Sequence, residues 1–150
     1  MRTSDRRARV LVAVLGASLA LLTVVGSAAA APRPMPITIE SAMTVSMPTA
    51  PNSGTFTSSG SDRICGSGSV LDTRYVWDLP DHLLVDKTFD CGDGLVYFRL
   101  SVHYSGDGDE TFTWTILGGT DTYAGLHGHG SGTTTVDDGV VNHYIGFLVH

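Results

Sequence analysis

The chain has 150 residues, enough for one domain of ordinary size. Its hydrophobic share of 42% and charged share of 16% exclude an intrinsically disordered protein, and its two cysteines are too few for a small scaffold held by several disulfides. A formal net charge of −6 argues against a nucleic-acid partner, because binding to phosphates needs clustered lysine and arginine.

The first thirty residues have the pattern of a secretory signal peptide. An apolar run over residues 10–25 is shorter than the ~20 residues of a typical bilayer span, and three alanines follow at 28–30. Four arginines precede the run: Arg2, Arg6, Arg7 and Arg9. We predict that residues 1–30 are a cleaved signal peptide and that the protein is secreted, with an uncleaved membrane anchor as the alternative.

Removal of residues 1–30 would leave a strongly acidic chain. Residues 31–150 carry 14 acidic and 5 basic side chains, a formal net charge of −9, and Lys87 is their single lysine. Such a surface disfavours DNA, RNA and anionic membranes. The composition therefore predicts no nucleic-acid partner, and no membrane contact after signal cleavage.

Export also determines what the two cysteines are expected to do. In an oxidising compartment, Cys65 and Cys91 are predicted to form one disulfide. Free thiols or a metal-binding pair are the alternatives, but two isolated cysteines without closely spaced partners make a poor zinc site.

The segment that follows the signal has two parts. Pro32, Pro34 and Pro36 predict a flexible, extended, proline-rich leader over residues 31–36. From residue 37 to 47 apolar and polar side chains alternate, which is the period of a strand with one buried face. We therefore expect a single β domain over residues 37–150, with a second strand over 54–59.

Residues 68–79 form the next predicted strand, and its two faces differ in polarity. One face contains three charges among Val70, Asp72, Arg74, Val76 and Asp78. We therefore expect the other face to lie in the core: Leu71, Thr73, Tyr75, Trp77 and Leu79.

Alternation continues through the rest of the chain. Every second residue lies on the apolar face over 83–91, which includes Lys87, and again over 96–104 and 112–116. Two further strands are predicted over 126–136 and 140–149, joined by a hairpin turn at Asp137-Asp138-Gly139. Seven or eight short strands indicate an all-β fold, and sequential hairpins favour a small antiparallel up-and-down β-barrel over a β-sandwich.

One glycine-rich segment resembles a known group of barrels. The run from Gly118 and Gly119 through Tyr123 and Gly125 to Gly128 and Gly130 is similar to the glycine-rich turn and strand of the allene oxide cyclase and dirigent β-barrels. Together with Ile64–Gly68 and Lys87–Gly94, it also resembles small secreted actinobacterial proteins with no assigned activity. The likeness covers most of residues 53–135 and implies a barrel of about eight strands.

The match to that group departs at one position. Asp121 stands where those barrels have a third glycine, and aspartate tolerates left-handed backbone better than most residues, so the expected fold is retained. No active-site residue of the group can be matched here, and the catalytic residues stay unknown.

Three glycines on one strand face allow two interpretations. Gly128, Gly130 and Gly132 leave space that Trp114 could fill, or at which the strand could bend. The functional alternative is a lumen hollow enough for a ligand. We prefer the structural interpretation, because side chains usually fill small barrels.

Histidines and acidic residues supply weak candidates for metal sites. Imidazoles of His127, His129 and His143 could converge on zinc or copper, and Asp107, Asp109 and Glu110 could bind calcium. We prefer solvent-facing histidines and a solvated acidic turn, and we predict no metal and no cofactor.

Two functions remain compatible with this pattern. The chain has no nucleophile elbow, phosphate loop or HExxH motif, and the acidic residues that can be placed fall on polar faces or turns. We therefore favour a non-catalytic module that binds an apolar small molecule, a cell-envelope component or a protein. The alternative is a cyclase- or isomerase-like enzyme acting on a hydrophobic small molecule inside the barrel. By default we expect the aromatic side chains to form the core; if the barrel is open at one end, rings from this set would line the pocket: Tyr75, Trp77, Phe98, Trp114 and Phe147.

Overall fold

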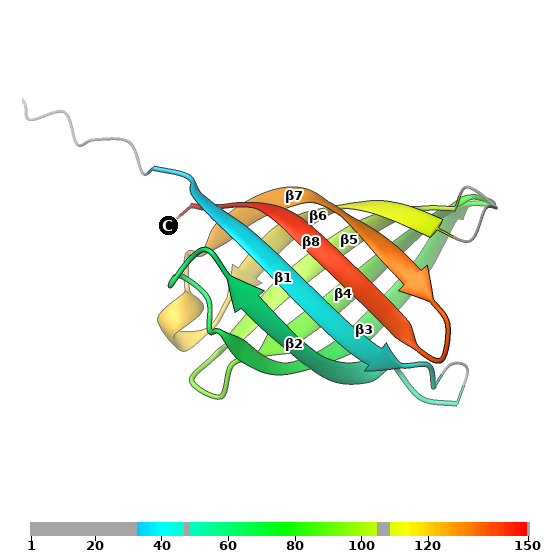
Figure 1. The fold of residues 1–150 in the computed structure, drawn as a ribbon, viewed down its shortest axis with the longest axis horizontal. Helices are drawn as coiled ribbons and strands as arrows, with labels where there is room; N and C mark the ends of the chain where they lie inside the picture. The colour runs from blue at the N-terminus through cyan, green and yellow to red at the C-terminus, as the bar shows by residue number, and fades with distance from the viewer. Residues whose placement is uncertain (1–32, 47–48, 105–108, 150) are drawn as a thin grey trace, which may run out of the picture. The chain divides into compact units, whose positions relative to one another are not determined.

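Eight strands close into one antiparallel up-and-down barrel in the computed structural model, which describes residues 33–46, 49–104 and 109–149 (Figure 1). Each strand pairs with the next along the chain, and β8 pairs with β1 to close the ring. The predicted barrel is confirmed, and the alternative of a sandwich is wrong. The strands are β1 Met35–Thr44, β2 Ser53–Ser59, β3 Ser67–Leu79, β4 His82–Asp90, β5 Leu95–His103, β6 Asp109–Gly119, β7 His127–Val136 and β8 Val140–Val149.

The barrel begins earlier than the sequence pattern indicates. Met35 and Pro36, the last two residues of the predicted leader, belong to β1 and lie opposite Leu148 and Phe147 of β8. The predicted signal peptide lies outside the described residues. Within the described ranges, no helix has the length and apolar character needed to cross a bilayer.

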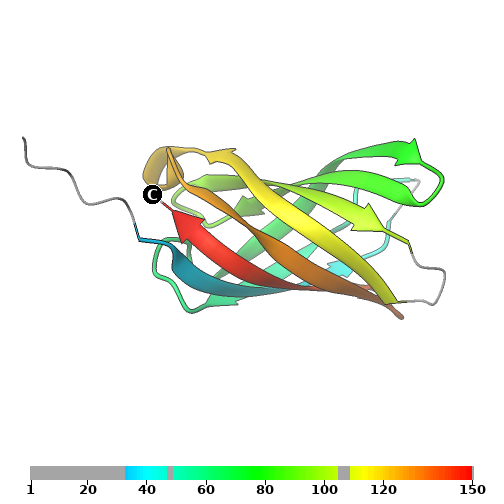
Figure 2. The same cartoon turned by 90° about the horizontal axis from the view of Figure 1, so that it is seen from above.

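Successive turns lie at opposite ends of the barrel (Figures 1 and 2). One end holds residues 60–66, residues 91–94 and the short 3₁₀ helix η1 (Asp121–Tyr123), and we call it the disulfide end. The other end holds the tight turns at 80–81 and 137–139, and we call it the cavity end. β1 starts and β8 finishes at the disulfide end (Figure 1).

The predicted disulfide is confirmed. Cys65, which follows β2, is bonded to Cys91, which follows β4, with the two Cα atoms 5.7 Å apart. The bond joins two turns that are separated by a complete β-hairpin. It therefore cross-links two turns that are not joined by strand pairing.

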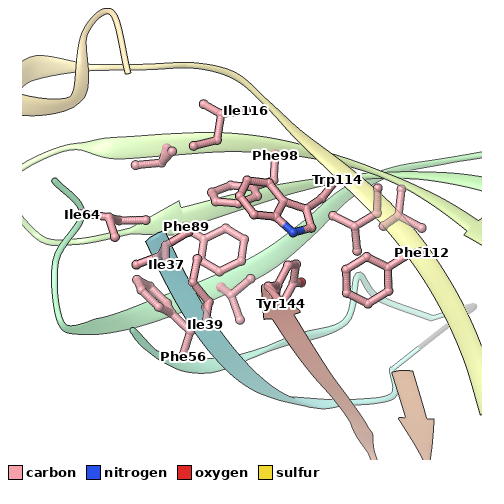
Figure 3. Packing of buried hydrophobic residues seen from close by; sticks show 14 of the residues in the cluster. Ile37, Ile39, Phe56, Ile64, Phe89, Phe98, Phe112, Trp114, Ile116 and Tyr144 are labelled. Carbon is pink, nitrogen blue, oxygen red and sulfur yellow. The ribbon is translucent and has the colours of Figure 1, made fainter. Parts of the chain in front are cut away.

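Aromatic side chains fill the lumen toward the disulfide end (Figure 3). The ring centroids of Phe89 and Phe98 are 4.4 Å apart, and those of Phe98 and Trp114 are 5.4 Å apart. Tyr144 packs edge-on against Phe112 at 4.9 Å. These rings come from alternate positions of β4, β5, β6 and β8, so the period-two pattern of the sequence builds this core directly.

The prediction for the faces of residues 68–79 is wrong for most of the strand. Asp72 is buried, whereas Leu71 and Trp77 are 41% and 61% exposed. Asp72 pairs with Lys87 and Arg74 pairs with Asp86, so one extra residue of β3 is inserted between them as a β-bulge. Asp72 therefore faces inward before the bulge and Tyr75 faces inward after it, and no single face carries all the apolar side chains.

Glycines on β7 and β8 make room for the indole ring of Trp114. A Cβ atom at Gly130 or Gly146 would collide with that ring and with the carbonyl oxygen of a neighbouring strand. Phe112 fills the space beside Gly132 in the same way. This agrees with the interpretation that the glycines of this strand face leave space for a bulky neighbouring side chain such as Trp114.

Candidate functional site

The lumen is hollow near the cavity end. A cavity of about 120 Å³ lies there, and its apolar walls are Leu83 and Val85 of β4, Leu100 and Val102 of β5, and Val140 of β8. The sequence supplies these walls through the same alternation that supplies the aromatic core. The barrel is therefore filled in one half and open to a small guest in the other.

A buried ion pair lies beside these walls. Asp72 and Lys87 occupy directly opposite positions on β3 and β4, and the Nζ atom of Lys87 donates to Oδ1 of Asp72 at 2.5 Å. Each side chain is only 4% exposed. Lysine and aspartate are almost never this buried unless paired, so each satisfies the charge of the other.

Two further donors hold Asp72 in place. The hydroxyl of Tyr75 donates to Oδ2 of Asp72 at 2.5 Å, and Nδ2 of Asn52 donates to the same oxygen at 3.3 Å. Oδ1 of Asn52 in turn accepts from the backbone N–H of Ser46 at 2.9 Å. The carboxylate is therefore a fixed acceptor whose lone pairs are largely in use.

The protonation states of this group follow from burial. Desolvation lowers the pKa of Lys87, and the adjacent Asp72 carboxylate opposes that change. Burial and the hydrogen bond to Asp72 raise the pKa of Tyr75, so this phenol is a donor at neutral pH. A second N–H of Lys87 reaches Sδ of Met43 at 3.2 Å, and a thioether is a weak acceptor that a ligand oxygen could replace.

A second polar group borders the cavity on β1, β7 and β8. Oγ1 of Thr134 donates to Oδ1 of Asn142 at 2.7 Å, and Nδ2 of Asn142 donates to Oγ of Ser41 at 3.2 Å. The hydroxyl of Tyr144 is buried without a hydrogen-bond partner in the described part of the chain. Burial raises the pKa of the Tyr144 hydroxyl.

The mouth of the cavity combines aromatic rings with a carboxyl group. Tyr75, Tyr104, Glu110 and Val136 line it, and the ring of Tyr104 stacks on Trp77 with centroids 5.4 Å apart. Burial raises the pKa of Glu110, and burial followed by the nearby charge of Glu110 raises that of Tyr104. The mouth is therefore polar and aromatic, whereas the walls are aliphatic.

The predicted pocket residues are only partly in this site. Tyr75 lines the cavity, but Phe98 and Trp114 are buried in the aromatic core on the side of the disulfide end. Trp77 and Phe147 do not line the lumen, since Trp77 is 61% and Phe147 49% exposed. Phe147 points outward because its neighbours on β8, at even positions, take the inward places.

The glycine motif lies away from the cavity, at the disulfide end. Asp121 has a φ of 50°, the left-handed backbone expected at this position. The ring of Tyr123 is buried against Gly94 and Gly119, and its hydroxyl donates to Oδ1 of Asp93 at 2.9 Å. The motif thus closes one end of the barrel, and its evident role is structural.

The three histidines do not converge. His127 and His129 are exposed on the outer face of β7, and His143 pairs with Thr133, four positions along β7 from His129. Nδ1 of His143 lies 3.4 Å from Oε2 of Glu40 instead. Among the described residues, no group of three or more histidine, cysteine, aspartate or glutamate side chains could hold a metal ion. Of the proposed calcium ligands, Asp107 and the Asp109 side chain lie outside the described residues, and Glu110 lines the cavity mouth.

Three larger hollows lie outside the lumen. Two of them, of about 420 and 540 Å³, flank Ile145 on the outer face of the barrel, and a third of about 610 Å³ lies against the disulfide. Of these hollows and the lumen cavity, all in the described part of the chain, the lumen cavity is the one whose lining includes the buried Asp72 and Lys87 beside apolar walls. We therefore take the lumen cavity as the candidate site.

Comparison with other proteins adds no relative. No known protein family, curated protein or solved structure matches the chain. The structure thus shows an eight-stranded antiparallel barrel, and no comparison links it to the allene oxide cyclase and dirigent barrels.

Sequence reasoning missed the ionic part of the site. The expectation that the acidic residues lie on polar faces or turns is wrong for Asp72, which the bulge in β3 leaves on the inner face. A signal for its partner was present, because Lys87 occupies an inward position between Val85 and Phe89. A lone lysine on an apolar strand face indicates a buried acidic partner on a neighbouring strand.

Proposed function

We propose that this protein is a secreted, non-enzymatic barrel that binds a small, partly apolar molecule in the lumen cavity. The observation that carries the proposal is a hollow with aliphatic walls that ends on a buried, hydrogen-bonded ion pair. Small-molecule sites commonly combine apolar walls with a few fixed polar groups. At about 120 Å³ the cavity suits a compound of only a few heavy atoms, since one water occupies roughly 30 Å³ of liquid volume.

Secretion is supported by two separate features. The first thirty residues have the basic, apolar and small-residue order of a cleaved signal. The Cys65–Cys91 disulfide fits an oxidising compartment. Mass spectrometry of the exported protein should give an N-terminus directly after Ala30, and a full-length chain retained in cells would contradict this part of the proposal.

The buried ion pair does not supply the general base that the cyclase- or isomerase-like alternative would need. A general base needs a free lone pair directed at the substrate. Asp72 instead accepts from Lys87, Tyr75 and Asn52, which leaves it little capacity to take a proton from a guest. The pair therefore forms a fixed polar end of the cavity and is poorly suited to take a proton from a guest.

The test uses three four-carbon probes: n-butylammonium, 1-butanol and butyrate. Binding of at least one should shift the methyl NMR signals of Val85, Val102 and Val140, which line the walls. Val102→Phe should fill the cavity and abolish those shifts, whereas Leu117→Phe, on the outer face, should retain them. The proposal fails if no probe shifts the wall methyls, or if Val102→Phe folds and binds like the wild type.

A further inference from the structure

The charges around the lumen cavity do not balance. Asp72 is neutralised by Lys87, but Glu110, which lines the mouth, forms no ion pair with any described residue. Elsewhere in the described chain, the partly buried Asp86 is matched by Arg99 at 2.7 Å. The site therefore carries one carboxyl group whose countercharge no described residue provides.

The groups beside Glu110 are those that attract organic cations. Tyr75 and Tyr104 present aromatic rings at the mouth, and the stacking of Trp77 on Tyr104 holds that ring in place. The faces of aromatic rings attract ammonium groups, and more strongly where water is partly excluded. A carboxylate next to a tyrosine ring therefore favours a cation in two ways: the carboxylate attracts it by its negative charge, and the ring attracts it by its face.

The buried Asp72–Lys87 pair, at the inner end of the cavity, determines the orientation of such a guest. Lys87 would repel an ammonium group brought close to it, so the charged end belongs at the mouth. The carbon chain then fits between Val85, Val102 and Val140. An anionic guest is disfavoured in both orientations, because Asp72 already pairs with Lys87 and Glu110 would face it at the mouth.

We propose that the ligand of the lumen cavity is a small organic monocation, whose ammonium group lies between the Glu110 carboxylate and the Tyr104 ring and whose apolar part enters the barrel. The inference rests on the proposed binding function and specifies the class of compound that the cavity accepts.

The three four-carbon probes also test this inference, because they match in length and differ in charge. We expect n-butylammonium to bind at least about tenfold more tightly than 1-butanol, and butyrate to bind more weakly than both; a tenfold ratio corresponds to about 1.4 kcal/mol. The dissociation constants come from NMR titration of the wall methyls at pH 7.

Three variants separate the contributions of charge and ring. Glu110→Gln should bring n-butylammonium to within about threefold of 1-butanol, and an unchanged dispersion of the wall-methyl signals without any probe shows that the barrel is folded. Tyr104→Phe should keep the preference for the cation, whereas Tyr104→Leu should reduce it.

The outcomes distinguish this inference from the proposed function. Equal or tighter binding of 1-butanol or butyrate would overturn the inference and leave cavity binding intact, as would a cation preference that survives Glu110→Gln. Failure of all three probes would overturn both.

Discussion

Asp72 and Lys87 face each other across β3 and β4 and direct both of their charges into the lumen. Lys87 is the only lysine of the chain, and its head group is held by Asp72 inside the barrel. An extra residue in β3, directly after Asp72, allows this strand to turn Asp72 inward and Arg74 outward to Asp86. The local irregularity of one strand thus places an ion pair where the overall pattern of the chain predicts aliphatic side chains.

Breaking this pair should destabilise the protein strongly. Lys87→Met leaves a buried, uncompensated carboxylate, and we expect it to lower the free energy of unfolding by about 3–5 kcal/mol, measured by urea denaturation. Lys87→Met combined with Asp72→Leu removes both charges and should recover most of that loss.

The control is an ion pair of similar geometry on the outer face. Arg99→Gln removes the nearer of the two arginine partners of Asp86 and leaves Arg74 at 3.7 Å; the Arg99 side chain is 39% exposed, and the change should cost less than about 1 kcal/mol. A single Lys87→Met variant as stable as Arg99→Gln would show that Lys87 is not buried with Asp72.

Glycines under the Trp114 ring should tolerate no side chain. Gly130→Ala places a methyl group against the carbonyl oxygen of Ile145 and the indole, so we expect a loss of about 1–3 kcal/mol. Gly66→Ala is the matched control, because nothing lies within 4 Å of its Cβ position, and it should be neutral or slightly stabilising. Equal thermal midpoints for the two variants would contradict the packing described here.

Sequence reasoning located most of the barrel and little of the site, for reasons that particular residues make clear. Alternation is regular in β4 and β5, so positions such as Val85, Phe89 and Phe98 are assigned to the core correctly. In β3 the bulge reverses the inward parity between Asp72 and Tyr75, and a pattern of fixed period cannot represent that reversal.

The end of the chain illustrates a different limit. The aromatic character of Phe147 predicts a place in the pocket, yet its position on β8 turns it outward, while Tyr144 and Leu148 point inward. The aromatic character of a residue therefore does not predict its burial, because exposure depends on whether its position along the strand faces inward or outward. Asp121, in contrast, was interpreted from its backbone tolerance, and its φ of 50° agrees with that reasoning.

Loss of the disulfide should weaken the barrel without changing its topology. The Cys65–Cys91 bond closes a loop of 26 residues, for which chain entropy gives about 3–4 kcal/mol of stabilisation. Replacing both cysteines by serine should lower the free energy of urea-induced unfolding by this amount. An unchanged midpoint would mean that the unfolded chain gains no freedom when the bond is removed.

The carboxyl group at the cavity mouth should make stability depend on pH. Burial raises the pKa of Glu110 above its ordinary value near 4.5, so the folded chain binds more protons than the unfolded chain just above that pH. Stability should therefore fall as pH rises through this window, in a manner absent from Glu110→Gln. Tyr75, Tyr104, Lys87 and Asp72 also face this region, and the comparison with Glu110→Gln removes contributions that the two proteins share. Parallel stability curves for the two proteins between pH 4 and 7 would contradict a raised pKa.

The most direct measurement uses the fact that the chain has one lysine. In protein labelled with ¹⁵N-lysine, we predict one protected ¹⁵Nζ ammonium cross-peak, which shifts when a four-carbon probe enters the lumen and is unaffected by the probe in Val102→Phe. A lysine ammonium that exchanges with water as fast as a free side chain, or a protected one that none of the three probes shifts, would contradict a ligand cavity that ends on the Asp72–Lys87 pair.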